Sequence, residues 1–135
     1  MKALLRAQKE QIQRMNRKAE ADKQEQELAE TVFRQSDVYN KFHLAAKGGD
    51  APITSSDWEA LRVETDQCYK KFSSRLRSLY PVSNMELRIC LLLKIGISTT
   101  GIALLCGRTK SAIVSARKRL YEKTHQQSLT IQTFV

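Results

Sequence analysis

Proline and glycine are placed so sparsely in this chain that most of it favours helices. Two of the 135 residues are proline and five are glycine, and none of these lies between Lys2 and Ala46. Ala, Leu, Gln, Glu, Lys and Arg dominate the remainder, and these are good helix formers, whereas runs typical of strands are rare. The sequence therefore predicts an all-α fold.

The first 47 residues have the pattern of a helical arm, with apolar side chains thinly spread among charges and glutamines. Two stripes recur at spacings of three, four and seven residues: Leu5, Ile12, Met15, Ala19, Ala29 and Phe33, and Leu28, Val32, Tyr39 and Phe42. Gln8, Asp22 and Gln26 interrupt the first stripe. We predict one long helix over residues 1–47, a coiled-coil linker through which two copies form a homodimer. An isolated, partly frayed polar helix is the alternative.

A turn and a second helix follow this arm. Lys47 to Pro52 contain adjacent glycines and a proline, which break a helix. Thr54 and Asp57 have the spacing of a capping box, so a new helix is expected there. Its apolar stripe contains Trp58, Leu61, Thr65, Cys68, Phe72, Leu76 and Leu79. We predict one connecting amphipathic helix over residues 53–80, with its aromatic side chains in the core and not stacked on bases.

The apolar segment that follows has clear start and stop signals. Ser83 and Glu86 form a second capping box, and Gly96 is placed to end the helix that they begin. The residues between them are apolar on almost every side, as expected of a short central helix.

Residues 82–124 are predicted to form a helix-turn-helix domain. Ser98 can cap a short helix that Gly107 ends, and Thr109 can cap the last helix, expected over about residues 110–123. Two short helices joined by a turn that contains glycine are typical of DNA-binding helix-turn-helix units.

The last helix is amphipathic and basic, and this favours duplex DNA. Its apolar residues at helical spacing are Ile113, Ala116 and Leu120. The opposite face presents the predicted base contacts, Ser111, Val114, Ser115 and Lys118. Lys118 can donate to guanine O6 and N7, Ser115 can bond several base edges, and Val114 can touch a thymine methyl group. The formal net charge of +9 also favours a polyanionic partner.

Other polar residues at the ends and flanks of this helix suit phosphates. The predicted phosphate contacts are Arg108, Thr109, Lys110, Arg117, Arg119 and Lys123. They would set the affinity and its dependence on salt. A solvated charged helix without a ligand is the alternative for a charge run alone, but here the run follows a tight helix-turn.

The C-terminal half resembles a known family. The residues that carry the likeness are Ile102 to Leu105, Gly107 to Ile113 and Ala116 to Lys123, preceded by Ile53 to Trp58, Phe72, Leu76, Leu79 to Pro81 and Glu86 to Cys90. They resemble the C-terminal LuxR/GerE-type helix-turn-helix of Bacteroidetes transcriptional regulators, over about Ile53 to Lys123.

This resemblance implies a transcription regulator whose output domain binds DNA as a dimer, with RNA polymerase as a further partner. It implies base contacts at Val114, Ser115 and Lys118, in agreement with the face derived above. In the family the output domain commonly follows tetratricopeptide repeats, a membrane helix and a coiled-coil linker. We therefore expect either a stand-alone cytoplasmic regulator or the cytoplasmic part of a longer membrane-anchored one.

Three features depart from the family pattern. Gly101 replaces a helix-favouring residue, at a cost of about 1 kcal/mol relative to Ala. Arg108 stands where many LuxR-type domains carry an apolar residue, so a looser turn is expected. The tail, residues 125–135, has no counterpart that we can assign.

An enzyme is not expected. His43 and His125 have no ligand or catalytic partner by spacing, and the sequence contains no GxSxG, P-loop or HExxH motif. Cys68, Cys90 and Cys106 are odd in number and have no CxxC pair, which argues against disulfides and a zinc site. We predict no cofactor, no metal, no small-molecule site and no membrane span.

A non-enzymatic interaction module is the main rival. In that hypothesis the arm pairs with a partner coiled coil, and the basic helix binds RNA or an acidic membrane. The deep, narrow major groove of RNA admits side chains poorly, and the apolar face of residues 110–123 is narrow for a membrane helix. Both points favour duplex DNA.

Overall fold

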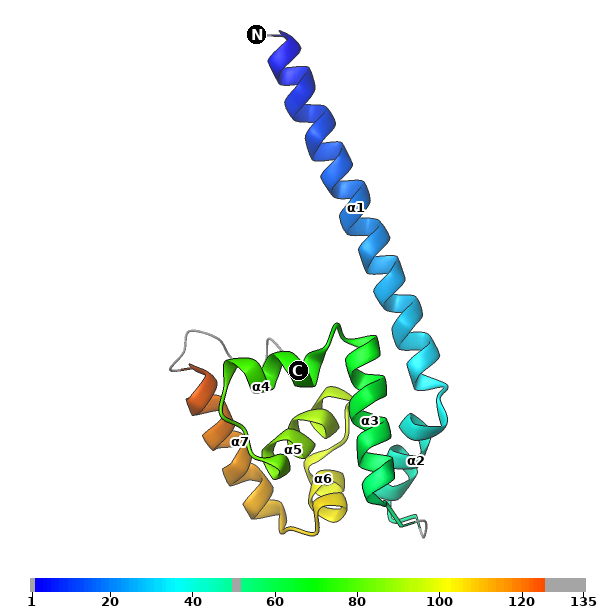
Figure 1. The fold of residues 1–135 in the computed structure, drawn as a ribbon, viewed down its shortest axis with the longest axis vertical. Coiled ribbons are helices and arrows are strands. Elements are labelled where there is room, and N and C mark those ends of the chain that lie inside the picture. Colours follow the sequence, from blue (N-terminus) through cyan, green and yellow to red (C-terminus); the bar gives the residue numbers. More distant parts are fainter. Residues whose placement is uncertain (1, 50–51, 126–135) are drawn as a thin grey trace. The chain divides into compact units, whose positions relative to one another are not determined.

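The computed structural model describes residues 2–49 and 52–125, which form seven helices and no strand (Figure 1). The helices are α1 Lys2–Arg34, α2 Asp37–Ala46, α3 Ser55–Cys68, α4 Phe72–Leu79, α5 Asn84–Lys94, α6 Thr99–Cys106 and α7 Lys110–His125. The all-α prediction is confirmed. Residues 126–135, almost all of the predicted tail, lie outside the described residues. None of the described helices is long and apolar enough to span a bilayer.

The chain divides into two compact units, the first ending at Val32 and the second beginning at Phe33. The first unit contains α1 as far as Val32. The second contains the last two residues of α1, Phe33 and Arg34, and α2 to α7. The helix predicted to run unbroken through residues 1–47 is therefore two helices, and the shorter one, α2, belongs to the globular unit and not to the arm.

Ser36 is the reason for that break. Its hydroxyl group donates to the Phe33 carbonyl at 2.6 Å and accepts from the Tyr39 amide at 3.3 Å, so it closes one helix and caps the next. Asp37 then places a carboxylate in the first turn of α2, where the helix dipole favours it. Local hydrogen bonds of serine compete with the helix ladder and can end a helix without glycine or proline.

α2 packs into the globular unit along one side. Phe42 is fully buried, and its ring meets Trp58 of α3 edge-on with centroids 4.9 Å apart. His43, expected on a polar arm, is half-buried, and its Nε2 donates at 2.9 Å to the carbonyl of Ile95, the residue that follows α5. The prediction that this segment continues the arm is therefore wrong. The apolar side chains of α2 pack in the core of the globular unit.

The connecting helix predicted over residues 53–80 is also two helices, α3 and α4. Lys70 and Lys71 between them adopt left-handed backbone conformations, with φ of 52° and 62°. The Asp66 carboxylate stabilises this turn, because it accepts hydrogen bonds from the Ser73 amide and hydroxyl at 2.7 Å each. A side chain of α3 thus caps α4, which the apolar spacing alone could not reveal.

The central helix α5 is surrounded by its neighbours. Its buried side chains are Leu87, Ile89, Cys90, Leu91 and Leu92. α5 packs against α3, α6 and α7, which lie around it in Figure 1. Both predicted capping boxes are present, at Thr54 with Asp57 and at Ser83 with Glu86.

Gly101 allows two helices to pack closely, which its low helix propensity does not indicate. A Cβ atom at this position would lie 2.8 Å from Ile97 Cγ2 and 2.9 Å from Ala46 Cβ, closer than real Cβ atoms approach. The missing side chain therefore lets the end of α2 lie directly against α6. Gly101 is the contact point of the two helices and not merely a weak position in α6.

The Gly101→Ala variant should therefore be less stable than the wild type. Helix propensity alone predicts a gain of about 1 kcal/mol, whereas overpacking costs about 1–3 kcal/mol, so we expect a net loss of up to about 2 kcal/mol. Urea denaturation measures this free energy of unfolding. Thr100→Ala, at an exposed position in the same helix, is the control and should be neutral or stabilising. A stabilised Gly101→Ala variant would show that α2 does not pack closely on α6.

Candidate nucleic-acid interface

α5, α6 and α7 form a three-helix unit with the predicted turns. The Ser98 hydroxyl caps α6 by accepting from the Gly101 amide at 3.1 Å. Gly107 ends α6 in a left-handed conformation with φ of 64°, which glycine adopts without strain. The Thr109 hydroxyl then accepts from the Ala112 amide at 3.1 Å at the start of α7. Only two residues therefore separate Gly107 from α7, and the turn between the helices is tight.

One side of α7 is anchored in the core. Ile113, Ala116 and Leu120 are buried, and α7 packs against both α5 and α6. These are the three residues that the spacing predicted to face inward, and that prediction is confirmed. The anchor fixes the rotation of α7 about its own axis, and hence which of its residues face solvent.

The opposite side of α7 is open in this chain. The four predicted base contacts are all exposed: Ser111, Val114, Ser115 and Lys118. Val114 is 53% exposed, although it lies one residue from the buried Ile113. The combination of a small hydroxyl, an exposed methyl-bearing side chain and an ammonium group on one face can provide donors, acceptors and an apolar contact to a groove.

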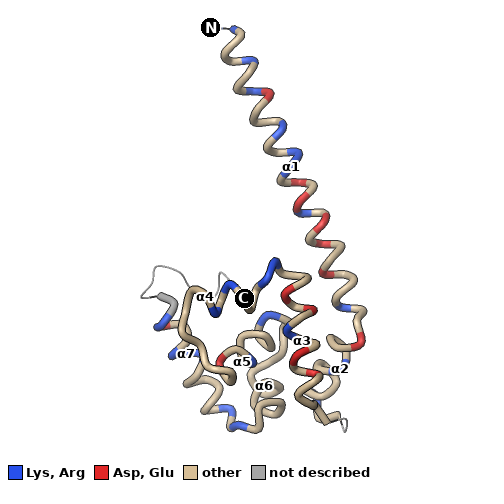
Figure 2. Tube along the Cα trace, in the orientation of Figure 1, with Lys and Arg blue, Asp and Glu red and all other residues tan. Residues whose placement is uncertain are grey.

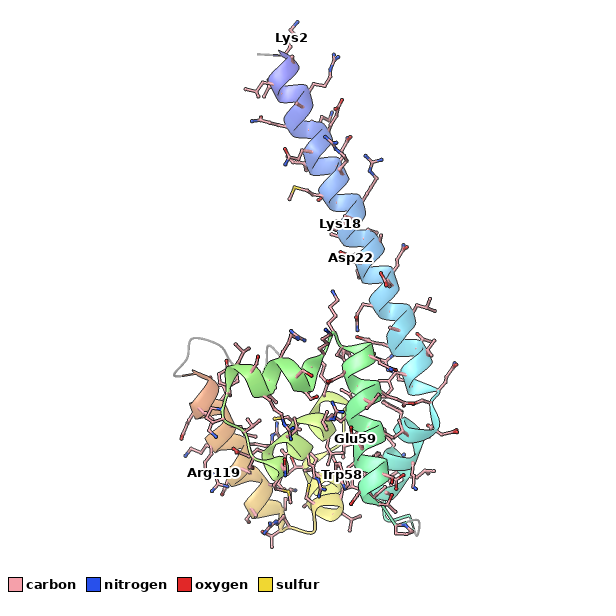
Figure 3. All side chains as sticks on the ribbon, viewed as in Figure 1. Lys2, Lys18, Asp22, Trp58, Glu59 and Arg119 are labelled. Atoms are coloured by element: carbon pink, nitrogen blue, oxygen red, sulfur yellow. The ribbon has the colours of Figure 1, made fainter. Side chains whose placement is uncertain are left out.

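The predicted phosphate contacts differ in their surroundings. Arg108, Thr109, Lys110, Arg117 and Arg119 are exposed, and the basic positions form the blue segments of α7 and its preceding turn in Figure 2. Arg117 Nη1 donates to Thr99 Oγ1 at 3.0 Å, which ties α7 to the first turn of α6. The side chain of Arg119, labelled in Figure 3, extends from α7.

Lys123 has a structural partner. Its ammonium group donates to the Pro81 carbonyl at 2.9 Å and lies 3.4 Å from Glu86 Oε2. These contacts hold the end of α7 against the start of α5. Lys123 is therefore engaged within the chain and, unlike the exposed cations earlier in α7, it is only partly exposed.

A groove of about 410 Å³ lies between α5 and α7. Its lining residues are Ser83, Met85, Glu86, Ile89, Arg108, Ala112, Ile113, Ala116 and Arg119. Two of the predicted phosphate contacts, Arg108 and Arg119, thus border the same groove. Residue spacing does not identify Met85 and Ala112 as neighbours of these arginines, since it does not show how closely α5 and α7 approach.

Among the described residues that line this groove, Glu86 is the one acidic group, and other groups of the chain already pair with it. Partial burial opposes ionisation, but the Ser83 amide and the Lys123 ammonium group outweigh it and hold the pKa of Glu86 below its ordinary value. Its carboxylate accepts from the Ser83 amide at 2.9 Å. Since Glu86 is already paired, its negative charge does little to repel an anion from Arg108 and Arg119 at this groove.

Burial keeps the thiols of Cys90 and Cys106 protonated. Burial raises the pKa of the Cys90 thiol to about 12, and burial also raises the pKa of Cys106, against the opposing charges of Arg88 and Arg108. Thiols with raised pKa values remain protonated and poorly reactive near pH 7. Within residues 2–49 and 52–125, no group of three or more His, Cys, Asp or Glu side chains is placed to hold a metal ion.

Comparison with known proteins adds no further constraint. No protein-family model, no curated protein and no solved structure gives a significant match to this chain.

The Glu86→Gln variant tests the contact between α5 and α7. Because folding lowers the pKa of Glu86, its carboxylate contributes stability that is fully present above the ordinary value of 4.5 and is lost as the pH falls through the lower folded value. The stability difference between wild type and Glu86→Gln should be constant near neutral pH and shrink below about pH 4.5. Urea denaturation at several pH values measures it. Glu122→Gln, the same change at an exposed position of α7, is the control, and identical pH profiles for both variants would refute the contact.

Proposed function

We propose that this protein is a sequence-specific regulator of transcription that binds double-stranded DNA by placing α7 in the major groove. The main support for this proposal is that Ile113, Ala116 and Leu120 are buried while the opposite face of the same helix is exposed. A major groove about 12 Å wide admits one such helix. Function and packing therefore use different faces of α7.

The exposed residues suit base edges in complementary ways. Lys118 can donate to guanine O6 and N7, Ser115 can donate or accept, and Val114 can contact the methyl group of thymine. Ser111, near the start of α7, extends the same face. We propose that α7 docks in the usual arrangement of this motif, in which the N-terminal part of the second helix contacts the bases.

The flanking cations suit the phosphates on either side of the groove. Arg108 and Arg119 border the groove between α5 and α7, and Arg117 is held by Thr99 on the side of α6. A side chain that is already oriented loses less conformational entropy when it binds. Lys123 contributes less in this proposal, because its ammonium group is bonded to Pro81 and lies beside Glu86.

RNA and acidic membranes are weaker partners for this surface. The major groove of RNA is deep and narrow and excludes a helix. A membrane-surface helix needs a broad exposed apolar face, whereas the main apolar residues of α7 are buried in the core. Both features favour duplex DNA over the non-enzymatic interaction module.

The resemblance of residues 53–123 to LuxR/GerE-type output domains leads to the same proposal. A regulator of this kind acts in the cytoplasm, at promoters, with RNA polymerase as its further partner. We propose no catalytic activity and no cofactor.

Substitution at Lys118 and Arg119 separates base contacts from phosphate contacts. Lys118→Ala should lose about 1–3 kcal/mol of discrimination at one base pair, whereas Arg119→Ala should weaken binding to all duplexes and lower the salt slope by about 1. Selection from random duplexes supplies the preferred site, and fluorescence anisotropy across a salt series then measures each affinity. Lys70→Ala, a loss of one exposed charge away from α7, is the matched control.

Small and equal losses for Lys118→Ala, Arg119→Ala and Lys70→Ala would contradict the proposed interface. Parallel titrations with duplex RNA and with anionic vesicles test the rival directly. Equal affinity for all three polyanions would mean that the chain binds charge and not a DNA groove.

A further inference from the structure

α1 exposes apolar side chains along a helix with nothing packed on them. Every side chain from Lys2 to Glu25 is exposed, and Leu5, Ile12 and Met15 are 65%, 58% and 62% exposed. Most helical stability in proteins comes from packing of an apolar face, and isolated helices are marginal in water. α1 therefore has the composition of a helix that pairs with something.

The exposed apolar residues define the side that would be covered. Leu5, Ile12 and Ala19 follow one another at intervals of seven residues, and Met15 lies three residues after Ile12. Residues at this spacing form one seam when two helices coil around each other. We call these four residues the α1 seam. Lys9 and Lys18 flank it at the positions where charged side chains set partner and orientation.

The charges of α1 are segregated along its length (Figure 2). The first part carries Lys2, Arg6, Lys9, Arg14, Arg17 and Lys18 against Glu10 alone. The next part carries Glu20, Asp22, Glu25, Glu27 and Glu30 against Lys23 alone. Lys18 and Asp22, labelled in Figure 3, mark where the sign changes. One helix thus contains a basic segment, residues 2–18, followed by an acidic segment, residues 20–30.

We propose that α1 pairs with α1 of a second copy of this chain in the antiparallel direction. In a parallel pair in register, the two basic segments would face each other, the two acidic segments likewise, and Asp22 would lie beside Asp22 near the seam. In an antiparallel pair, each basic segment faces an acidic one. Like-charge juxtaposition is unfavourable and opposite-charge juxtaposition is favourable, so the charge pattern selects the antiparallel direction.

The same charge pattern favours a second copy over other occupants. Nucleic acid or an anionic membrane would attract the basic segment but repel the acidic segment immediately after it. Another α1 helix complements both segments at once. The partner that fits the whole length of α1 is therefore α1 itself.

Antiparallel pairing has a consequence for the assembly. α1 contains 33 residues, which corresponds to a length of about 50 Å at 1.5 Å per residue. The two chains leave an antiparallel pair at opposite ends. A dimer of this kind joins two globular units by their arms and does not rely on the arms to hold both units at one site.

Distances between spin labels measure the direction of pairing. Cysteine is introduced separately at Ala3 and at Ala21, both exposed and outside the seam, in a full-length chain carrying Cys106→Ala; Cys68 and Cys90 are buried. For an antiparallel pair, the Ala3 labels should lie about 40 Å or more apart and the Ala21 labels within about 25 Å, given the helical rise. Sedimentation on the same samples establishes that a dimer is present.

Short distances at both positions would overturn the proposal in favour of parallel pairing. A chain that stays monomeric at tens of micromolar would overturn self-association altogether. Neither result depends on DNA binding by α7, so this proposal and the proposed function can fail separately.

A charge reversal tests the cause of the direction. Arg6→Glu with Lys9→Glu, two changes in the basic segment away from the middle of the pair, replaces attraction by repulsion in an antiparallel pair and should weaken dimerisation about tenfold, the sum of several helix-pair terms. Lys47→Glu with Lys70→Glu, the same change at exposed positions of the globular unit, should change it less than about twofold. Equal or tighter dimerisation of the Arg6 and Lys9 variant would contradict an antiparallel pair, because a parallel pair exchanges one like-charged contact for another.

Discussion

The burial of one side of α7 against α5 and α6 is the constraint on which the candidate interface depends. Ile113, Ala116 and Leu120 fix the rotation of the helix, so Ser111, Ser115 and Lys118 face outward. If α7 were free to roll about its axis, its exposed residues would define no surface. The contact of Lys123 with Pro81 and Glu86 fixes the far end of the same helix. Contacts within the chain thus fix the orientation of α7 before any ligand binds.

α6 connects α7 to the rest of the globular unit through direct contacts. On one side Arg117 of α7 bonds to Thr99 in its first turn. On another, Gly101 allows the end of α2 to pack without a gap. His43 ties α2 to the end of α5 as well. The segment after α1 is therefore part of the body that holds α7.

Capping signals and apolar spacing predicted much of this fold. The two capping boxes, the glycine that ends α6 and the inward face of α7 all depend on neighbours within a few residues, and sequence shows these directly. The exposed faces of α7 followed from the same spacing. Periodicity gave the right fold class because helices dominate the chain.

The errors came from interactions that periodicity does not show. Ser36 and the Asp66 carboxylate end and restart helices without glycine or proline, so both breaks were missed. Gly101 looked like a cost because its neighbour, Ala46, is distant in sequence. The partner of Lys123 was hidden for the same reason, since Glu86 belongs to another helix. Contacts between residues distant in sequence decide the roles of Gly101 and Lys123, and periodicity in one sequence does not show them.

Nuclear magnetic resonance of the full-length chain, titrated with its selected duplex, tests the central claim most directly. The account predicts that the amide signals of Ser111, Ser115 and Lys118 and the methyl signals of Val114 shift on binding, while the methyl signals of the buried Leu120 shift much less. Shifts confined to α1, or an α7 surface left unchanged by saturating duplex, would contradict it.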